Sequence, residues 1–100
     1  MQRLVQIAKI LSDINRVKII ALMQREKELC VCEICDTLTL SQPLVSRHLK
    51  LMREAELVQT RQSGKWMIYS LTQNKILNCL LEDLQEEFAQ LPKIVACARC

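Results

Sequence analysis

The sequence predicts a mainly helical fold that carries one β-hairpin. Half of the 100 residues are hydrophobic, yet only three are aromatic and one is glycine, which favours helices over sheets. Residues 32–39 and 41–55 predict two helices with a very short link, the layout of a helix-turn-helix. Residues 57–70 then predict a hairpin, in the position of a wing. We therefore expect a winged helix-turn-helix with about five helices and two strands.

Capping and spacing signals place the helices before the hairpin. Apolar residues recur at helical spacing over residues 2–11, which predicts the first helix. Asp13 is a suitable N-cap for a second helix, which we expect to end near Arg25–Lys27. Ser41 is expected to cap the helix over residues 41–55, with Pro43 in its first turn, where a missing N–H costs little.

The C-terminal part predicts the wing and one more helix. Residues 57–61 and 66–70 favour strands, and the turn between them holds the only glycine. Thr72 is expected to cap a last helix that Pro92 ends. The apolar stripes of the first and last helices exceed what one small core absorbs, so we expect a homodimer; the alternative is that they cover only their own domain. The expected dimer interface comprises Leu4, Ile7, Leu11, Leu77, Leu80, Leu81, Leu84 and Phe88.

We expect one domain over residues 1–91 and a tail over residues 92–100. No apolar run is long enough for a membrane span, and the N-terminus lacks the pattern of a signal peptide, so a cytoplasmic protein without a membrane partner is expected. Residues 41–71 contain five basic and two acidic residues, which makes this the basic segment of the chain. A surface that contacts phosphates needs such a bias, although ordinary surface charge would give the same count.

The helix over residues 41–55 has an apolar face and a polar face. We expect the polar face to enter the major groove of double-stranded DNA, where Gln42 suits adenine and Arg47 suits guanine. The wing tip is expected to contact the DNA backbone. His48, the only histidine, is expected to face DNA or to be structural. The predicted DNA-binding residues are Ser41, Gln42, Ser46, Arg47, His48, Lys50, Arg61, Gln62, Ser63 and Lys65. The alternative is a solvated helix face beside a hydrophilic hairpin.

Three cysteines lie within six residues, in the order Cys-Val-Cys-Glu-Ile-Cys. Cys32 and Cys35 share one helix face, and Cys30 joins them only if the chain around it is not helical or the first turn of the helix deforms. Soft thiolates select thiophilic metals and metalloids, and three sulfurs suit a three-coordinate centre better than a tetrahedral zinc. We therefore predict a metal site at Cys30, Cys32 and Cys35, the alternative being that one of them is a small core residue.

The other cysteines are less informative. Cys97 and Cys100 form a possible secondary thiol site, with a frayed tail as the alternative, and Cys79 is expected to be packed. A thiol enzyme has little support, because no phosphate-binding loop surrounds the cysteines. A structural zinc module is a further alternative.

The segments ELCVCEICDTL, LSQPLVSRHLKLMREAELV and RQSGKWMIYSLT resemble the ArsR/SmtB family of metal-sensing repressors, specifically its arsenite-responsive members. The resemblance covers residues 2–91. It implies a homodimer, paired through its first and last helices, that binds operator DNA and dissociates when As(III) or Sb(III) binds Cys30, Cys32 and Cys35. It also implies no organic cofactor, no small organic substrate and no enzymatic activity.

Two departures from the family pattern matter. Glu56 occupies a turn position where the family often has glycine, so a non-glycine residue with positive φ is expected there. Some arsenite-responsive relatives sense through thiols near the last helix, which keeps Cys97 and Cys100 as alternative sensors. Thiol redox sensing and sensing of another soft metal, such as cadmium or lead, are the alternatives to arsenite sensing.

Overall fold

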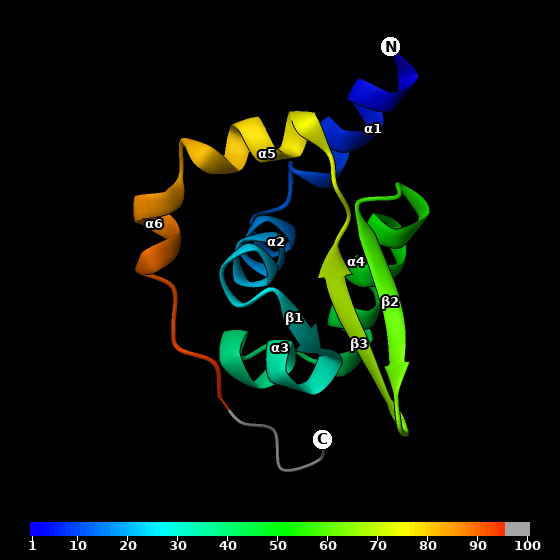
Figure 1. The fold of residues 1–100 in the computed structure, drawn as a ribbon, viewed down its shortest axis with the longest axis vertical. Helices are drawn as coiled ribbons and strands as arrows, with labels where there is room; N and C mark the ends of the chain where they lie inside the picture. Colours follow the sequence, from blue (N-terminus) through cyan, green and yellow to red (C-terminus); the bar gives the residue numbers. More distant parts are fainter. Residues whose placement is uncertain (96–100) are drawn as a thin grey trace.

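The computed structural model describes residues 1–95, which form helices around a small antiparallel sheet (Figure 1). In chain order the elements are α1 (Gln2–Ile10), α2 (Ile14–Glu26), β1 (Glu28–Cys30), α3 (Val31–Leu38), α4 (Gln42–Glu54), β2 (Val58–Ser63), β3 (Trp66–Leu71), α5 (Lys75–Glu82) and α6 (Gln85–Ala89). The winged helix-turn-helix that the sequence predicts is confirmed. Among the described residues, none of the helices has the length and apolar character needed to cross a membrane.

α2 forms the centre of the core. Its Ile19, Ile20 and Leu22 are completely buried, and it contacts β1, β3 and α6. The Asp13 carboxylate accepts hydrogen bonds from the backbone N–H groups of Asn15 at 2.8 Å and Arg16 at 3.4 Å, as expected of an N-cap. Burial of each large aliphatic side chain contributes roughly 1.5–3 kcal/mol, so the contacts of α2 are a major source of stability.

The link between α3 and α4 is only three residues long. Thr39 adopts a left-handed conformation at the end of α3, and Ser41 is the N-cap of α4, where its Oγ accepts from the Leu44 N–H. Pro43 lies in the first turn, as predicted. This tight link fixes the two helices of the helix-turn-helix against each other.

The sheet contains a strand that the sequence analysis missed. β1 pairs with β3, which also pairs with β2, so the strand order is β1-β3-β2. Cys30 lies opposite Ile68, and Leu29 lies opposite Tyr69. A strand of three residues is too short to show a period of two, and it is extended here because β3 offers it a pairing edge. The sheet therefore joins the start of α3 to the wing.

The last helix differs from the single helix predicted. It divides into α5 and α6, and Asn74, not Thr72, is the N-cap of α5, with its Oδ1 accepting from the Leu77 N–H at 2.9 Å. Thr72 instead pairs with the turn after α4: its N–H donates to the Leu57 carbonyl and its hydroxyl to the Glu56 carbonyl.

Packing continues past the predicted domain boundary at residue 91. The Arg25 guanidinium donates to the carbonyl oxygens of Leu91 at 2.8 Å and Pro92 at 2.6 Å. Ile94 packs against the core, and the Val95 N–H donates to Thr37 Oγ1 at 3.0 Å. The segment after α6 is therefore held between α2 and α3.

Glu56 has a φ of 60°, the positive value expected from the sequence. This conformation costs a residue with a Cβ about 1–2 kcal/mol, whereas glycine adopts it freely. We therefore expect Glu56→Gly to raise the free energy of unfolding by about 0.5–1 kcal/mol, after the greater entropy of unfolded glycine is subtracted. Urea unfolding measures this change. As a control, Glu54→Gly inside α4 should lower stability by about 1 kcal/mol; a loss of stability in both variants contradicts the prediction.

Candidate DNA-binding surface and thiol site

α4 turns an apolar face to the core and a polar face to solvent. Val45, Leu49 and Met52 are almost completely buried. The exposed polar residues predicted to contact DNA are Ser41, Gln42, Ser46, Arg47 and Lys50. α4 therefore carries a continuous polar surface on a rigidly packed helix, as an element that enters a DNA groove requires.

His48 does not belong to this surface. Its side chain is only 3% exposed, and neither ring nitrogen has a hydrogen-bond partner among the described residues. The prediction that His48 contacts DNA is therefore wrong for this conformation, because position 48 lies within the buried stripe of α4. Burial lowers the pKa of His48 below 6.5; Asp13 at the start of α2 opposes this shift, and Arg16 and Arg47 add to it.

The buried imidazole predicts a loss of stability in mild acid. As pH falls below about 6.5, the unfolded chain takes up a proton that folded His48 resists, so the free energy of unfolding decreases. Urea unfolding at pH 7.5 and pH 5.5 measures this decrease. In His48→Leu we expect the decrease to shrink and stability at pH 7.5 to rise by about 1 kcal/mol, because an unsatisfied polar group is removed. An equal decrease in both proteins would show that other groups cause it.

The wing residues predicted to contact DNA are exposed, but three of them have partners within the protein. Gln62 Nε2 donates to the Gly64 carbonyl at 3.2 Å. The Arg61 guanidinium donates to both carboxylate oxygens of Glu28 in β1, at 2.6 and 3.1 Å. This pairing lowers the pKa of the Glu28 carboxyl. Lys65 Nζ lies 5.3 Å from the centre of the Trp66 ring. An exposed ion pair is weak, so a DNA phosphate can replace Glu28 as the partner of Arg61.

Two cysteines of the predicted metal site lie close together. Cys30 is the N-cap of α3 and has extended backbone dihedral angles, which meets the condition that the sequence set for convergence. Its Sγ lies 3.3 Å from Cys32 Sγ. The Cys30 N–H donates to Glu33 Oε1 at 3.0 Å, which fixes the start of the helix.

The third cysteine is not yet in position for a shared ligand. Cys35 is on α3 and 4% exposed. Within residues 1–95, no group of three cysteine, histidine or acidic side chains is arranged to hold a metal ion. Cys97 and Cys100, the possible secondary site, lie outside the described residues. A ligand that requires three sulfurs must therefore move Cys35, or the first turn of α3, from its present place.

The elements that carry the three cysteines pack against both parts of the DNA-binding surface. α3, which carries Cys32 and Cys35, packs against α4. Cys30 ends β1, which pairs with β3 of the wing. The start of α3 is thus connected to α4 by helix packing and to the wing by strand pairing.

Comparison with known proteins identifies the family. Residues 13–60 match the family model described as bacterial regulatory protein, arsR family. An HTH-type transcriptional regulator of Methanocaldococcus jannaschii is 31% identical over 75 residues, which are 75% of this chain and 84% of that protein. The chain belongs to the arsR family. This is a family of transcription regulators, so the prediction that the chain is not an enzyme is confirmed.

The names of two further relatives of this arsR-family chain refer to arsenical resistance and to cadmium resistance. The arsenical resistance operon repressor of Escherichia coli (strain K12) is 47% identical over 68 residues, 68% of this chain and 58% of that protein. The cadmium resistance transcriptional regulatory protein of Listeria innocua is 39% identical over 72 residues, 72% of this chain and 60% of that protein. The chain thus spans little more than half the length of these curated relatives.

The fold is also that of solved relatives. HlyU from Vibrio cholerae is 28% identical, and the match covers 89% of this chain and 95% of that one with a TM-score of 0.77. The same protein has been solved under the description of reduced HlyU. The fold of this chain therefore matches that of a solved protein over most of its length.

The arsR-family chain exposes an apolar surface at the end where α1 and α5 lie (Figure 1). Leu4 and Val5 of α1 and Ile76 and Leu80 of α5 are each roughly half exposed. Four residues expected in the dimer interface are instead buried in the core of their own protomer, because the helix stripes also cover α2: these are Ile7, Leu77, Leu81 and Phe88. Leu11 and Leu84 are half-buried. Cys79, expected to be packed, is exposed on α5.

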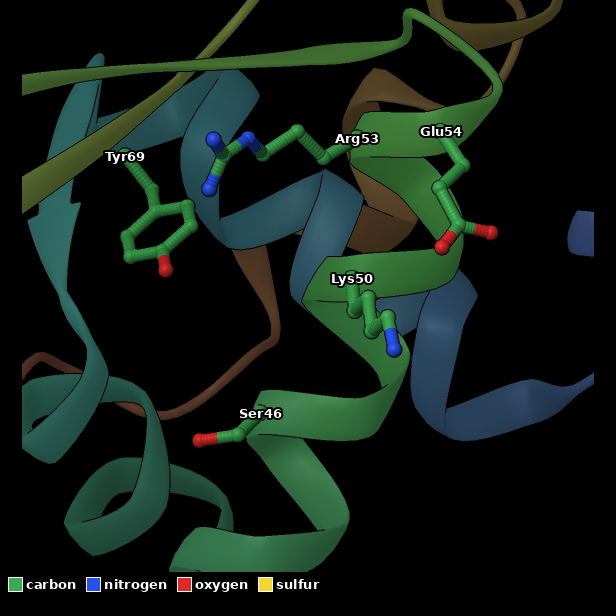
Figure 2. A pocket seen from close by; sticks show the side chains of 5 residues that line it. All are labelled: Ser46, Lys50, Arg53, Glu54 and Tyr69. Carbon is green, nitrogen blue, oxygen red and sulfur yellow. The ribbon is translucent and has the colours of Figure 1, made fainter.

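The structure also shows a cleft that the sequence analysis did not identify. It lies between α4 and β3 and has a volume of about 530 Å³ (Figure 2). Its lining residues are Ser46, Lys50, Arg53, Glu54 and Tyr69. Arg53 and Tyr69 were not selected from the sequence, because only pairing of β3 with β1 and β2 brings Tyr69 opposite α4.

Proposed function

We propose that this chain is an arsenite-responsive repressor that binds operator DNA as a homodimer and releases it when As(III) or Sb(III) binds Cys30, Cys32 and Cys35. The observation that carries the proposal is the Cys30–Cys32 sulfur pair, 3.3 Å apart at the start of α3. The relationship to the arsenical resistance operon repressor supports the choice of metalloid. The DNA-contact residues proposed are Ser41, Gln42, Ser46, Arg47, Lys50, Arg61, Gln62, Ser63 and Lys65.

The proposed binding reaction replaces oxygen by sulfur on arsenic. Arsenous acid, As(OH)₃, reacts with three thiols to form three As–S bonds and releases three water molecules. Thiolate sulfur is the soft donor that such a centre prefers, and three donors complete its coordination. Cys30 and Cys32 supply two adjacent sulfurs, and Cys35, on the same short helix, supplies the third after a local rearrangement.

This rearrangement provides the proposed link between inducer and DNA. The apo dimer has the spacing and orientation of α4 that fit the operator, whereas the metalloid-bound state holds the start of α3 in another geometry. Two recognition helices must lie one DNA turn apart, roughly 34 Å, so a small movement of α3 against α4 lowers the affinity. The pairing of β1 with β3 gives a second route, because it ties Cys30 to the wing.

Fluorescence anisotropy tests the proposal directly. A labelled duplex of about 30 base pairs from upstream of the chain's own gene is long enough for two half-sites. Under reducing conditions we expect tight binding by the apo protein and release on titration with sodium arsenite or potassium antimonyl tartrate. If DNA binding does not change with either metalloid, the proposed inducer is wrong. If the protein binds no upstream duplex, the proposed repressor function is wrong.

Redox sensing is the second candidate, favoured by the same sulfur pair. Hydrogen peroxide can oxidise two adjacent thiols to a disulfide, which takes two electrons and two protons from the thiols and forms two water molecules. Release of DNA by peroxide, reversed by dithiothreitol and without any response to arsenite, would select this function. Cadmium and lead ions in the same titration test the soft-metal alternative, which the cadmium resistance relative supports.

A further inference from the structure

The cleft between α4 and β3 brings together side chains suited to an oxyanion. Ser46, Lys50 and Arg53 occupy positions i, i+4 and i+7 of α4, so they form one stripe along the helix. Tyr69 faces this stripe from β3, and Figure 2 shows the Arg53 side chain extending toward it. Two cations and two hydroxyl groups therefore line a single opening.

The two cations of this stripe are not neutralised by ion pairs with the described residues. Among residues 1–95, Lys50 and Arg53 form no ion pair; the salt bridges there involve Arg25 and Arg61. Glu54 also lines the cleft. Figure 2 shows its carboxylate and the Lys50 ammonium on the flank of α4 away from Tyr69, whereas Arg53 extends toward Tyr69. The side of the opening between Arg53 and Tyr69 is thus positively charged and has donors available.

The two walls of the cleft are held by separate parts of the core. β3 is the central strand, and Tyr69 is paired with Leu29 of β1 on one side and Thr60 of β2 on the other. α4 is fixed by its buried apolar face. The spacing between the backbones of α4 and β3 at the cleft is therefore set before any ligand binds, which reduces the entropy lost on binding.

We propose that this cleft binds one phosphodiester of the DNA strand that borders the major groove. The guanidinium of Arg53 pairs with its oxygens, and the hydroxyls of Tyr69 and Ser46 donate hydrogen bonds to it. The exposed side chain of Lys50 joins them by rotating toward the cleft from the flank of α4. The inference rests on the proposed DNA binding and adds to it a backbone contact between recognition helix and wing. Such a contact fixes the register of α4 in the groove and does not itself read the base sequence.

The test compares two duplexes at several salt concentrations. One is the upstream duplex of about 30 base pairs, and the other is a scrambled duplex of the same composition. Arg53→Gln should weaken binding to both by about tenfold and reduce the slope of log K against log salt by about one. Tyr69→Phe should weaken both about threefold with no change in slope, because it removes a neutral donor. Lys93→Gln, a charge-matched control beyond α6, should change the affinity for each duplex and the salt slope by less than Arg53→Gln does.

A chemical change in the DNA identifies the phosphate. In a scan with single methylphosphonates, which remove one charge each, we expect one position per half-site where wild type and Arg53→Gln bind equally well. Thermal unfolding of each variant shows whether it is folded, and Arg53→Lys should restore the salt slope.

Four results overturn the inference. If the wild type binds DNA and Arg53→Gln has the same affinity and salt slope as Lys93→Gln, the cleft contacts no phosphate, although the proposed function stands. If Arg53→Gln weakens only the upstream duplex, Arg53 reads bases instead. If inorganic phosphate displaces both duplexes more effectively than sulfate at equal ionic strength, the cleft is a site for free phosphate. If the wild type binds neither duplex, the proposed function and the cleft site fail together.

Discussion

Replacing Cys32 by serine should abolish the response to arsenite and leave DNA binding intact. Cys32 Sγ lies 3.3 Å from Cys30 Sγ, and Cys32 is in the first turn of α3. Serine offers oxygen in place of a soft thiolate, so the three-sulfur centre cannot form. Because Cys32 is not part of the α4 surface, the affinity of the apo protein for DNA should remain within about twofold, within the scatter expected for a remote substitution.

The expected effect is large. Coupling between two sites is commonly about 1–3 kcal/mol, or about 5- to 150-fold in affinity, and all of it should disappear in Cys32→Ser. Anisotropy with the upstream duplex, with and without saturating arsenite, measures it. Cys79→Ser is the matched control, because Cys79 is exposed on α5 and should not take part. Release of DNA from both variants by arsenite would move the sensor away from α3, to Cys97 and Cys100.

The same coupling must appear in reverse. If arsenite lowers DNA affinity by a certain factor, saturating DNA must lower arsenite affinity by that factor. Calorimetric titration of arsenite into free and DNA-bound protein gives this second number. The two factors differ if arsenite acts by an irreversible reaction or by aggregating the protein, so agreement between them is evidence for a reversible switch.

Local signals in the sequence were sufficient to place most helices. Asp13 and Ser41 are side-chain caps whose hydrogen bonds are made with the next turn of backbone, so their effect does not depend on distant parts of the chain. The positive φ of Glu56 was likewise foreseeable, because it follows from a turn position common to the family. The extended backbone at Cys30 was anticipated as the condition for its sulfur to approach Cys32.

Features that depend on tertiary contacts were not foreseeable. β1 is extended only because it lies against β3, and the Arg61–Glu28 ion pair depends on that pairing. Tyr69 lines the cleft for the same reason, since a strand residue far along the chain must fold back beside α4.

The apolar stripes show most clearly where sequence reasoning ends. Periodicity identified the helix faces but did not separate residues that cover α2 from residues left at the surface. The structure makes this division: Leu77 and Leu81 point into the protomer, whereas Ile76 and Leu80 of the same helix remain exposed. The exposed set, with Leu4 and Val5 of α1, is the part available for the proposed dimer.

Leu80→Glu should therefore separate the dimer and abolish tight operator binding. Two-fold symmetry places this substitution in the interface twice, and a carboxylate buried there without a partner carries a desolvation cost of several kcal/mol. Leu80 is about half exposed in the protomer, so the monomer should stay folded. Sedimentation velocity should show a monomer, and the affinity for the upstream duplex should fall at least about a hundredfold, because the two half-sites are no longer bound together.

The control for this prediction introduces the same charge elsewhere. Ala89→Glu on α6 replaces an exposed apolar residue outside the Leu4, Val5, Ile76 and Leu80 set, so it should leave both the dimer and DNA binding unchanged. A Leu80→Glu protein that remains dimeric would place the interface on another surface. A monomeric protein that still binds the duplex with wild-type affinity would show that dimerisation is not needed for recognition, and the half-site argument for release by a small movement of α3 would then fail as well.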